Sequence, residues 1–182
     1  IDPEIIFCIG STQILPSEIL KIAVLGCINI HPALLPKYRG RYSTVWAIFN
    51  GERETGVTLH WMDNGIDSGP IISQKKIAIK LDDTAKSLYD KCTKEGGKLF
   101  IKFLQDWIRG NKIPKKRQNE KRATFYKKNL PNDGEIDWNW DGKKICNFIR
   151  AMTFEPFPPP SFMLGKTKMV IVDEKYLKKE NV

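Results

Sequence analysis

CINIHPALLPKYRG, residues 27–40, begins as a strand and ends as a proline-braced loop. The strand, Gly26–Ile30, is apolar, as is typical of strands buried within α/β sheets. Side chains two positions apart in a strand point to the same face, so Asn29 and His31 face one way and Ile30 the other. Ligands of open α/β sheets bind beside the carboxyl ends of strands. The stretch therefore predicts an α/β fold with a polar site at the end of this strand.

Predicted strands and helices alternate along the rest of the chain, which supports this fold class. Strands are expected at residues 4–10, 26–30, 56–62, 71–79, 134–140 and 169–174. Helices are expected at 16–21 and 44–50, over a long stretch that begins at Asp83 or Thr84, and after Asp141. Gly96 and Gly97 should weaken the long helix by about 1 kcal/mol each. The prolines of residues 154–162 should keep that segment extended.

The length of 182 residues suits one domain with a substantial core and a small appendage. No apolar run is long enough to span a bilayer and no signal peptide is visible, so no membrane association is expected. The four cysteines form no C-x-x-C pair and no Cys/His cluster, so no metal site is expected. Free thiols without a secretion signal indicate a cytoplasmic protein.

The net charge of +9 is concentrated in one stretch. Residues 109–128 hold nine Lys/Arg against one Glu, a local charge of +8. Such a stretch attracts the phosphates of a nucleotide or of a nucleic acid. A solvated lysine-rich loop is an equally good interpretation.

Asn29 and His31 together suit a reaction at a carbonyl group. An amide N–H beside an imidazole can stabilise an oxygen that gains negative charge during nucleophilic attack. A carboxylate is then needed to orient or charge the imidazole, and Asp67 in the turn GIDSG is the best candidate. Taken alone, the pattern is weak and favours a capped strand-end histidine and a turn-forming aspartate.

The wider sequence adds a resemblance. INIHPALLPKYRG, followed by WAIFNGERETGVTLHWMDNGIDSGPII, resembles the folate-dependent formyltransferases, a family that includes enzymes acting on methionyl-tRNA, glycinamide ribonucleotide and sugar nucleotides. The similarity extends from residue 1 to at least residue 162. The family's catalytic asparagine, histidine and aspartate fall on Asn29, His31 and Asp67.

The resemblance implies a Rossmann-like formyltransferase fold, an open, twisted and mostly parallel sheet flanked by helices. Because Ile1 is not an initiator methionine and IDPEIIFCIG reads as a strand already inside a domain, we expect the N-terminal part of this fold to be missing. A short C-terminal extension is expected to follow. Residues 1–110 would form the C-terminal half of the catalytic domain. Residues 111–135 would form a basic connecting segment, and 136–182 a small C-terminal subdomain or the start of one.

The implied reaction is transfer of a formyl group from 10-formyltetrahydrofolate to a primary amine, with no metal. Asn29 and a protonated His31 would stabilise the oxyanion, while Asp67 would keep His31 charged and help to relay the amine proton. The folate slot would be lined from two segments, by Gln13, Ile14 and Leu15 on one side and by Met62, Asn64, Gly65 and Ile66 on the other.

The acceptor is less closely defined. A nucleotide-linked amino sugar, an anionic small molecule, is favoured, and methionyl-tRNA is the alternative. Arg39 and Arg41 could contact such an anion or clamp their loop, and His60 is expected to be buried or supporting. A deformylase-type hydrolase, a non-catalytic RNA-binding module and a degenerate structural relative remain as other classes, and the oligomeric state is left open.

Overall fold

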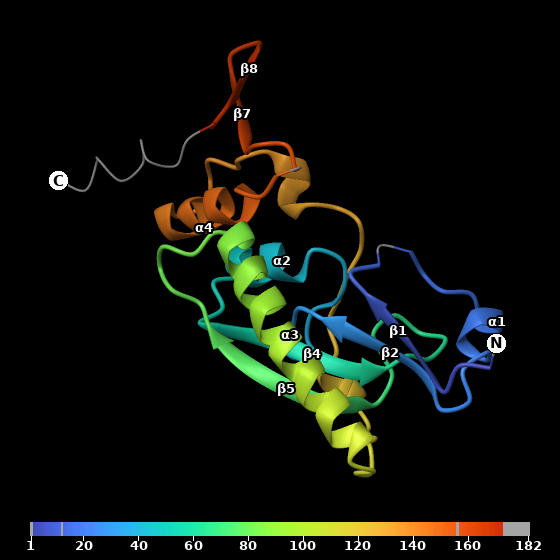
Figure 1. Ribbon diagram of the computed structural model, residues 1–182. Coiled ribbons are helices and arrows are strands. Elements are labelled where there is room, and N and C mark those ends of the chain that lie inside the picture. Colours follow the sequence, from blue (N-terminus) through green and yellow to red (C-terminus); the bar gives the residue numbers. More distant parts are fainter. Residues whose placement is uncertain (1, 12, 156, 173–182) are drawn as a thin grey trace.

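A four-stranded sheet forms the centre of the protein. The computed structural model describes residues 2–11, 13–155 and 157–172. The sheet order is β1-β2-β4-β5 (Figure 1). Strands β1 and β2 are parallel, whereas β2 pairs antiparallel with β4 and β4 antiparallel with β5. The four strands are β1 (Ile5–Ile9), β2 (Gly26–His31), β4 (Glu54–Trp61) and β5 (Ile71–Ala78).

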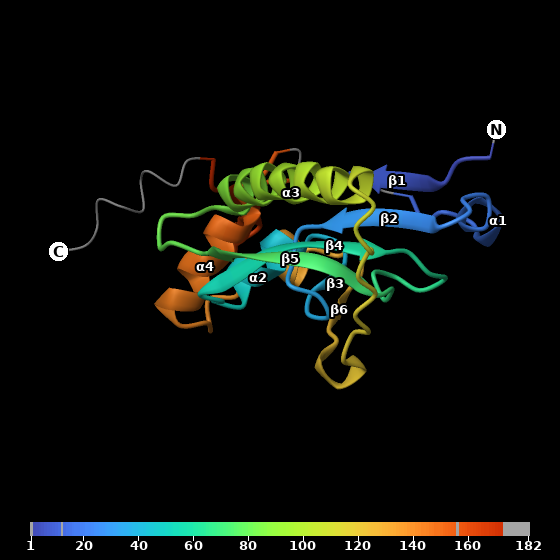
Figure 2. The same ribbon diagram turned by 60° about the horizontal axis from the view of Figure 1, so that its bottom comes forward.

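Helix α3 (Ala85–Ile108) lies along one face of this sheet, and the short parallel pair β3 (Arg39–Gly40) and β6 (Phe125–Tyr126) lies on the opposite face (Figure 2). Thr84 begins the helix with a capping box, since its hydroxyl accepts from the Ser87 N–H and the Ser87 hydroxyl accepts from the Thr84 N–H. The two faces therefore differ: one is buried under a long helix, and the other is left for short strands and loops.

Gly96 is the point of closest approach between α3 and the sheet. A Cβ atom added there would lie 3.1 Å from Ile30 and 3.3 Å from Val57. Helix α3 is continuous through Gly96 and Gly97, and the missing Cβ of Gly96 lets it pack tightly against β2 and β4. Ile30 therefore faces α3, and Asn29 and His31 face the other side. The weakening expected from the glycine pair stays a prediction.

The remaining elements complete the two ends of the molecule. Helices α2 and α4 pack together beside the start of α3 (Figure 1), and β7 and β8 form a separate hairpin. The bounds of the remaining helices and strands are α1 (Ser17–Leu20), α2 (Ser43–Phe49), α4 (Gly142–Met152), β7 (Ser161–Leu164) and β8 (Thr167–Val170). Short 3-10 helices lie at Glu120–Arg122 and Pro131–Gly134.

The α/β class is confirmed, with corrections of detail. The sheet is mixed rather than mostly parallel, since one of its three pairings is parallel. The strand expected at 134–140 is absent, because the Asp137 carboxylate accepts the Asn139 N–H and turns the chain. The last strand begins at Thr167 instead of 169, after a two-residue turn in which Gly165 has φ 62°. Its expected end at 173 and 174 lies outside the described residues.

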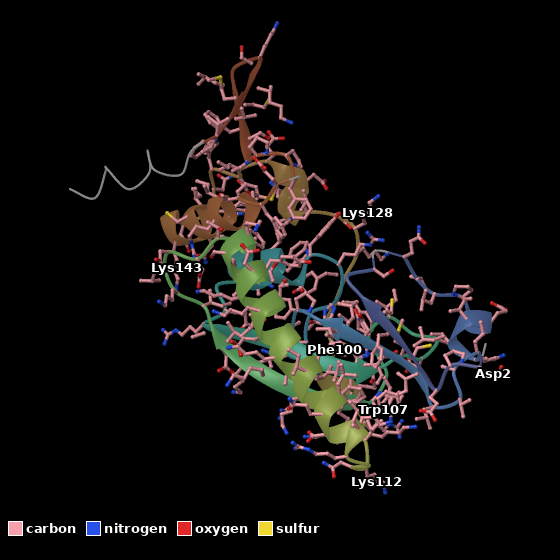
Figure 3. All side chains as sticks on the ribbon, viewed as in Figure 1. Asp2, Phe100, Trp107, Lys112, Lys128 and Lys143 are labelled. Carbon is pink, nitrogen blue, oxygen red and sulfur yellow. The ribbon has the colours of Figure 1, made fainter. Side chains whose placement is uncertain are left out.

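The basic stretch is not a compact patch. It starts at the end of α3 and runs across the molecule, so that Lys112 and Lys128 lie well apart (Figure 3). Among the described helices, none is long and apolar enough to cross a bilayer. Within residues 2–11, 13–155 and 157–172, no group of three His, Cys, Asp or Glu side chains is placed to hold a metal ion.

Helix α3 and the sheet enclose a buried apolar core. Leu88 is fully buried, whereas Leu81, just before the same helix, is 92% exposed. We expect Leu88→Ala to lower the free energy of unfolding by about 2–5 kcal/mol. The matched control Leu81→Ala should change it by less than about 0.5 kcal/mol. Urea denaturation of both variants checks this, and equal effects would contradict the described packing.

Candidate active site

The candidate site lies on the sheet face opposite α3. Asn29 and His31 project from the end of β2, and His60 of β4 is the direct cross-strand partner of Asn29. Directly opposed residues of an antiparallel pair share one face, so these three side chains lie together. Asp67 reaches them from the loop between β4 and β5, where its φ of 51° places it in the left-handed region.

The Asp67 carboxylate is the meeting point of the site. Its Oδ2 accepts a hydrogen bond of 2.8 Å from the Gly40 N–H and lies 3.4 Å from His31 Nδ1. Its Oδ1 lies 3.5 Å from His60 Nε2 and accepts from Asn29 Nδ2 at 3.4 Å. The structure therefore brings the three predicted catalytic side chains together, and it adds His60 to them.

Both imidazole rings are held in a fixed orientation by backbone carbonyls. His31 Nε2 donates to the Tyr38 carbonyl at 2.7 Å, so its Nδ1 faces Asp67. His60 Nδ1 donates to the Trp61 carbonyl at 2.7 Å, so its Nε2 accepts from Asn29 Nδ2 at 3.3 Å. A carbonyl can only accept, which assigns the N–H of each ring.

Burial and charge act in opposite directions on the two titratable groups. Burial lowers the pKa of His31, and the Asp67 carboxylate and the Tyr38 carbonyl offset only part of this effect. Burial would raise the pKa of Asp67, but hydrogen bonding to His60, the charge of His31 and the Gly40 N–H together lower it to about 2. Asp67 is therefore ionised at neutral pH. The expectation that it keeps His31 charged is not supported, because burial lowers the pKa of His31 more than the carboxylate raises it.

This arrangement suits proton transfer at a carbonyl centre. A neutral His31 that donates through Nε2 carries its lone pair on Nδ1, where it can accept a proton. The imidazolium that forms would then lie beside a carboxylate that is already ionised. The contacts of Asn29 are long for N–H donors, so its amide can exchange them for a substrate oxygen.

The two segments predicted to line the folate slot are largely exposed. Gln13, Ile14 and Leu15 lie between β1 and α1, and the Ile14 side chain is 77% exposed. The other four residues follow β4, where Ile66 is 48% exposed and Met62 is half-buried. Gly65 and the exposed Asn64 form a tight turn in which the Gly65 N–H donates to the Asp63 carboxylate. That N–H is therefore already used within the protein, and the folate contacts of the seven residues stay predictions.

Arg39 is buried and paired within the protein, which does not favour the predicted contact with an anionic acceptor. Its side chain is 1% exposed, and its guanidinium donates to Gln118 and Glu120. The alternative role, clamping the loop, is the one that the structure supports. Arg41 is half-buried and its N–H donates to the Tyr126 carbonyl, while its contact with an acceptor stays a prediction.

Sequence reasoning missed the groups that hydrogen-bond to His31 and Asp67 and hold them in position. They are the Tyr38 carbonyl, the Gly40 N–H and the Gln118 amide, which donates to the carbonyls of Asp67 and Gly69. Backbone groups leave no residue-specific signal. Gln118 is one of several uncharged side chains in a stretch with nine cations, and nothing in the pattern of charges marks it as buried.

Comparisons with known proteins place the chain in a family. Residues 1–104 match the family described as formyl transferase, and residues 129–181 match the formyl transferase C-terminal domain. The chain therefore belongs to the formyl transferase family.

Three relatives illustrate the match. A methionyl-tRNA formyltransferase from Caldanaerobacter subterraneus subsp. tengcongensis is 40% identical over 87% of this chain and 50% of its own length. The bifunctional polymyxin resistance protein ArnA of Wigglesworthia glossinidia brevipalpis is 43% identical over 93% of this chain and 26% of its own. The crystal structure of WlaRD, a sugar 3N-formyl transferase in the presence of dTDP and 5-N-formyl-THF, superposes with a TM-score of 0.76 at 31% identity, covering 91% of this chain and 59% of that one. The chain thus spans about half the length of the methionyl-tRNA formyltransferase.

The ionised Asp67 should stabilise the fold in a pH-dependent way. Because its folded-state pKa is lowered from 3.8 to about 2, this stabilisation is present above about pH 4 and is lost as the pH falls through about 2. The difference corresponds to roughly 2 kcal/mol. We expect Asp67→Asn to lower the free energy of unfolding by about that amount at pH 6 and by much less near pH 2.

Urea denaturation between pH 2 and pH 7 measures this effect. The exposed Asp82 provides the matched control, since Asp82→Asn should leave the pH profile of stability unchanged. A loss in Asp67→Asn that is the same at every pH would show that the carboxylate charge is not what its partners stabilise.

Proposed function

We propose that the protein transfers a formyl group from 10-formyltetrahydrofolate to a primary amine. The single observation that carries this proposal is the meeting of Asn29, His31 and Asp67 at distances of 3.4 Å. Membership of the formyl transferase family supplies the reaction class. Within the proposal, residues 1–110 contribute the catalytic part, 111–135 connect it, and 136–182 form a small subdomain.

Each side chain has one step in the proposed mechanism. The amine nitrogen attacks the formyl carbon, and the Asn29 amide N–H stabilises the formyl oxygen as it gains negative charge. His31 Nδ1 accepts the proton that the attacking nitrogen loses, and Asp67 stabilises the resulting imidazolium. The bond between the formyl carbon and the folate nitrogen then breaks, and His31 returns its proton to that nitrogen. The products are a formamide and tetrahydrofolate.

The residues proposed to line the folate slot have the apolar character that a folate would need. Ile14 and Ile66 are large apolar side chains that are exposed to solvent, by 77% and 48%. Leu15 and Met62, from the same two segments, are half-buried. Apolar walls with few polar groups are ordinary for a flat aromatic ligand such as a pterin. When bound, the folate supplies the activated formyl group.

A nucleotide-linked amino sugar is the acceptor that we favour. The similarity to WlaRD, a sugar 3N-formyl transferase whose structure was determined with dTDP, supports this choice. The cations of residues 109–128 suit a diphosphate. Methionyl-tRNA is the second candidate, supported by the 40% identity to a methionyl-tRNA formyltransferase and by the same cations.

A direct assay separates these possibilities. The complete protein is incubated with 10-formyltetrahydrofolate and either a dTDP-linked amino sugar or methionyl-tRNA, while tetrahydrofolate is followed. We expect turnover with the amino sugar and a 100-fold to 10,000-fold lower rate in Asn29→Ala, His31→Ala and Asp67→Ala. The control Asn111→Ala, in an exposed loop, should retain full activity.

Other outcomes overturn distinct parts of the proposal. A response to tRNA alone would replace the acceptor. Formate release without an amine would indicate a hydrolase of the deformylase type. Normal turnover in His31→Ala would refute the mechanism.

The folate slot can be tested without catalysis. Burial of an isoleucine side chain contributes about 1.5–3 kcal/mol, so Ile14→Ser should raise the Kd for 5-formyltetrahydrofolate about tenfold or more. The matched control is Ile108→Ser, which replaces an equally exposed isoleucine (82%, against 77% for Ile14) at the end of α3. Isothermal titration calorimetry measures both. Equal affinities for the two variants would remove Ile14 from the slot.

A further inference from the structure

The basic stretch carries one buried, uncharged side chain that reaches the candidate site. Gln118 is 5% exposed, and its Nε2 donates to the carbonyls of Asp67 at 2.8 Å and Gly69 at 2.7 Å. Its Oε1 accepts from Nε and Nη2 of Arg39 at 3.1 and 2.8 Å. A glutamine amide has two N–H donors and two acceptor lone pairs, so all four positions are used. The orientation of the amide is therefore fixed.

Arg39 connects Gln118 to the other half of the site. Its two neighbours supply the backbone groups that hold the reacting side chains, since the Tyr38 carbonyl binds His31 and the Gly40 N–H binds Asp67. The guanidinium is buried and also pairs with Glu120 at 2.7 Å. Residues 38–40 therefore cannot move relative to Gln118 without breaking charge-assisted hydrogen bonds.

The loop that bears Asp67 needs such support. A non-glycine residue in the left-handed region costs on the order of 1 kcal/mol, and it persists where the surroundings hold it. On one side, Gly69 is pressed against the end of β4, because a Cβ added there would lie 1.9 Å from the Trp61 carbonyl oxygen. On the other side, the two hydrogen bonds from Gln118 hold the carbonyls of residues 67 and 69.

We propose that Gln118 is a positioning residue that sets the distance between His31 and Asp67 by joining the backbone of residues 38–40 to that of residues 67–69. This role rests on the proposed function, because the positioned pair is the one that moves the amine proton. It also gives the basic stretch an internal function that its charges do not suggest. The cations of residues 109–128 are exposed, whereas the one buried amide of this stretch supports the candidate site.

Two substitutions separate the two sides of this brace. Gln118→Glu keeps an acceptor for Arg39 but removes both donors to the loop and sets a carboxylate oxygen against the two carbonyls, so the guanidinium stays paired while the loop loses its support. Gln118→Leu removes both sides. The matched controls are Gln105→Glu and Gln105→Leu, which replace an exposed glutamine on α3.

The readout is the titration of Asp67, followed by carbon-13 NMR of labelled aspartate carboxyl groups, together with formyl transfer by the complete protein. In both Gln118 variants we expect the Asp67 carboxyl to titrate at least one pH unit higher than in the parent protein. We also expect kcat to fall about 10-fold to 100-fold with the KM for the folate changed less than about 3-fold. The Gln105 variants should match the parent protein.

A purely structural role would lower the unfolding midpoint and leave the titration of Asp67 unchanged, and that result in a folded Gln118→Glu variant overturns the proposal. The NMR measurement does not depend on catalysis. If Asp67 shifts while the parent protein transfers no formyl group, the proposed function fails and the positioning role stands. If formyl transfer proceeds normally in Gln118→Glu, the positioning role fails and the function stands.

Discussion

A buried carboxylate that must find partners is the constraint on which the rest of this structure depends. The Asp67 carboxylate is ionised although its side chain is only 13% exposed. A charge removed from water is tolerated only where hydrogen bonds and opposite charge replace its hydration. The Asn29 amide and the Gly40 N–H donate to this carboxylate, and the His31 and His60 rings lie 3.4 and 3.5 Å from it. These neighbours come from β2, β4 and β3, so the surroundings of one carboxylate fix the arrangement of the three strands.

The antiparallel course of β4 explains why the loop of Asp67 is shaped as it is. Because β4 runs opposite to β2, its end lies beside Ile28, at the start of the site strand. The chain must therefore turn back along the sheet to bring Asp67 toward Asn29 and His31. The turn built on Asp63, the left-handed backbone of Asp67 and the tight packing of Gly69 are the local means of this return.

The sequence was informative wherever a short-range period determines geometry. The alternation of β2 predicts that Asn29 and His31 share a face, and the glycine-flanked turn identifies Asp67 as the available carboxylate. It was uninformative where burial depends on distant partners. Arg39 and Gln118 are ordinary surface residue types, and only the contact between two segments 79 residues apart makes both buried. Helix propensity likewise takes no account of the strands that Gly96 approaches, so the sequence did not reveal the packing role of that glycine.

The order of the site residues along the chain has a consequence for protein synthesis. Asn29, His31 and Asp67 leave the ribosome before the groups that support them. The Tyr38 N–H bonds the Thr124 hydroxyl, 86 residues later, and the Asp67 carbonyl bonds the Gln118 amide, 51 residues later. A nascent chain stopped between residues 80 and 110 would expose the buried carboxylate and the unpaired Arg39 guanidinium to water. Translation must therefore pass β6 before the candidate site can acquire its final arrangement.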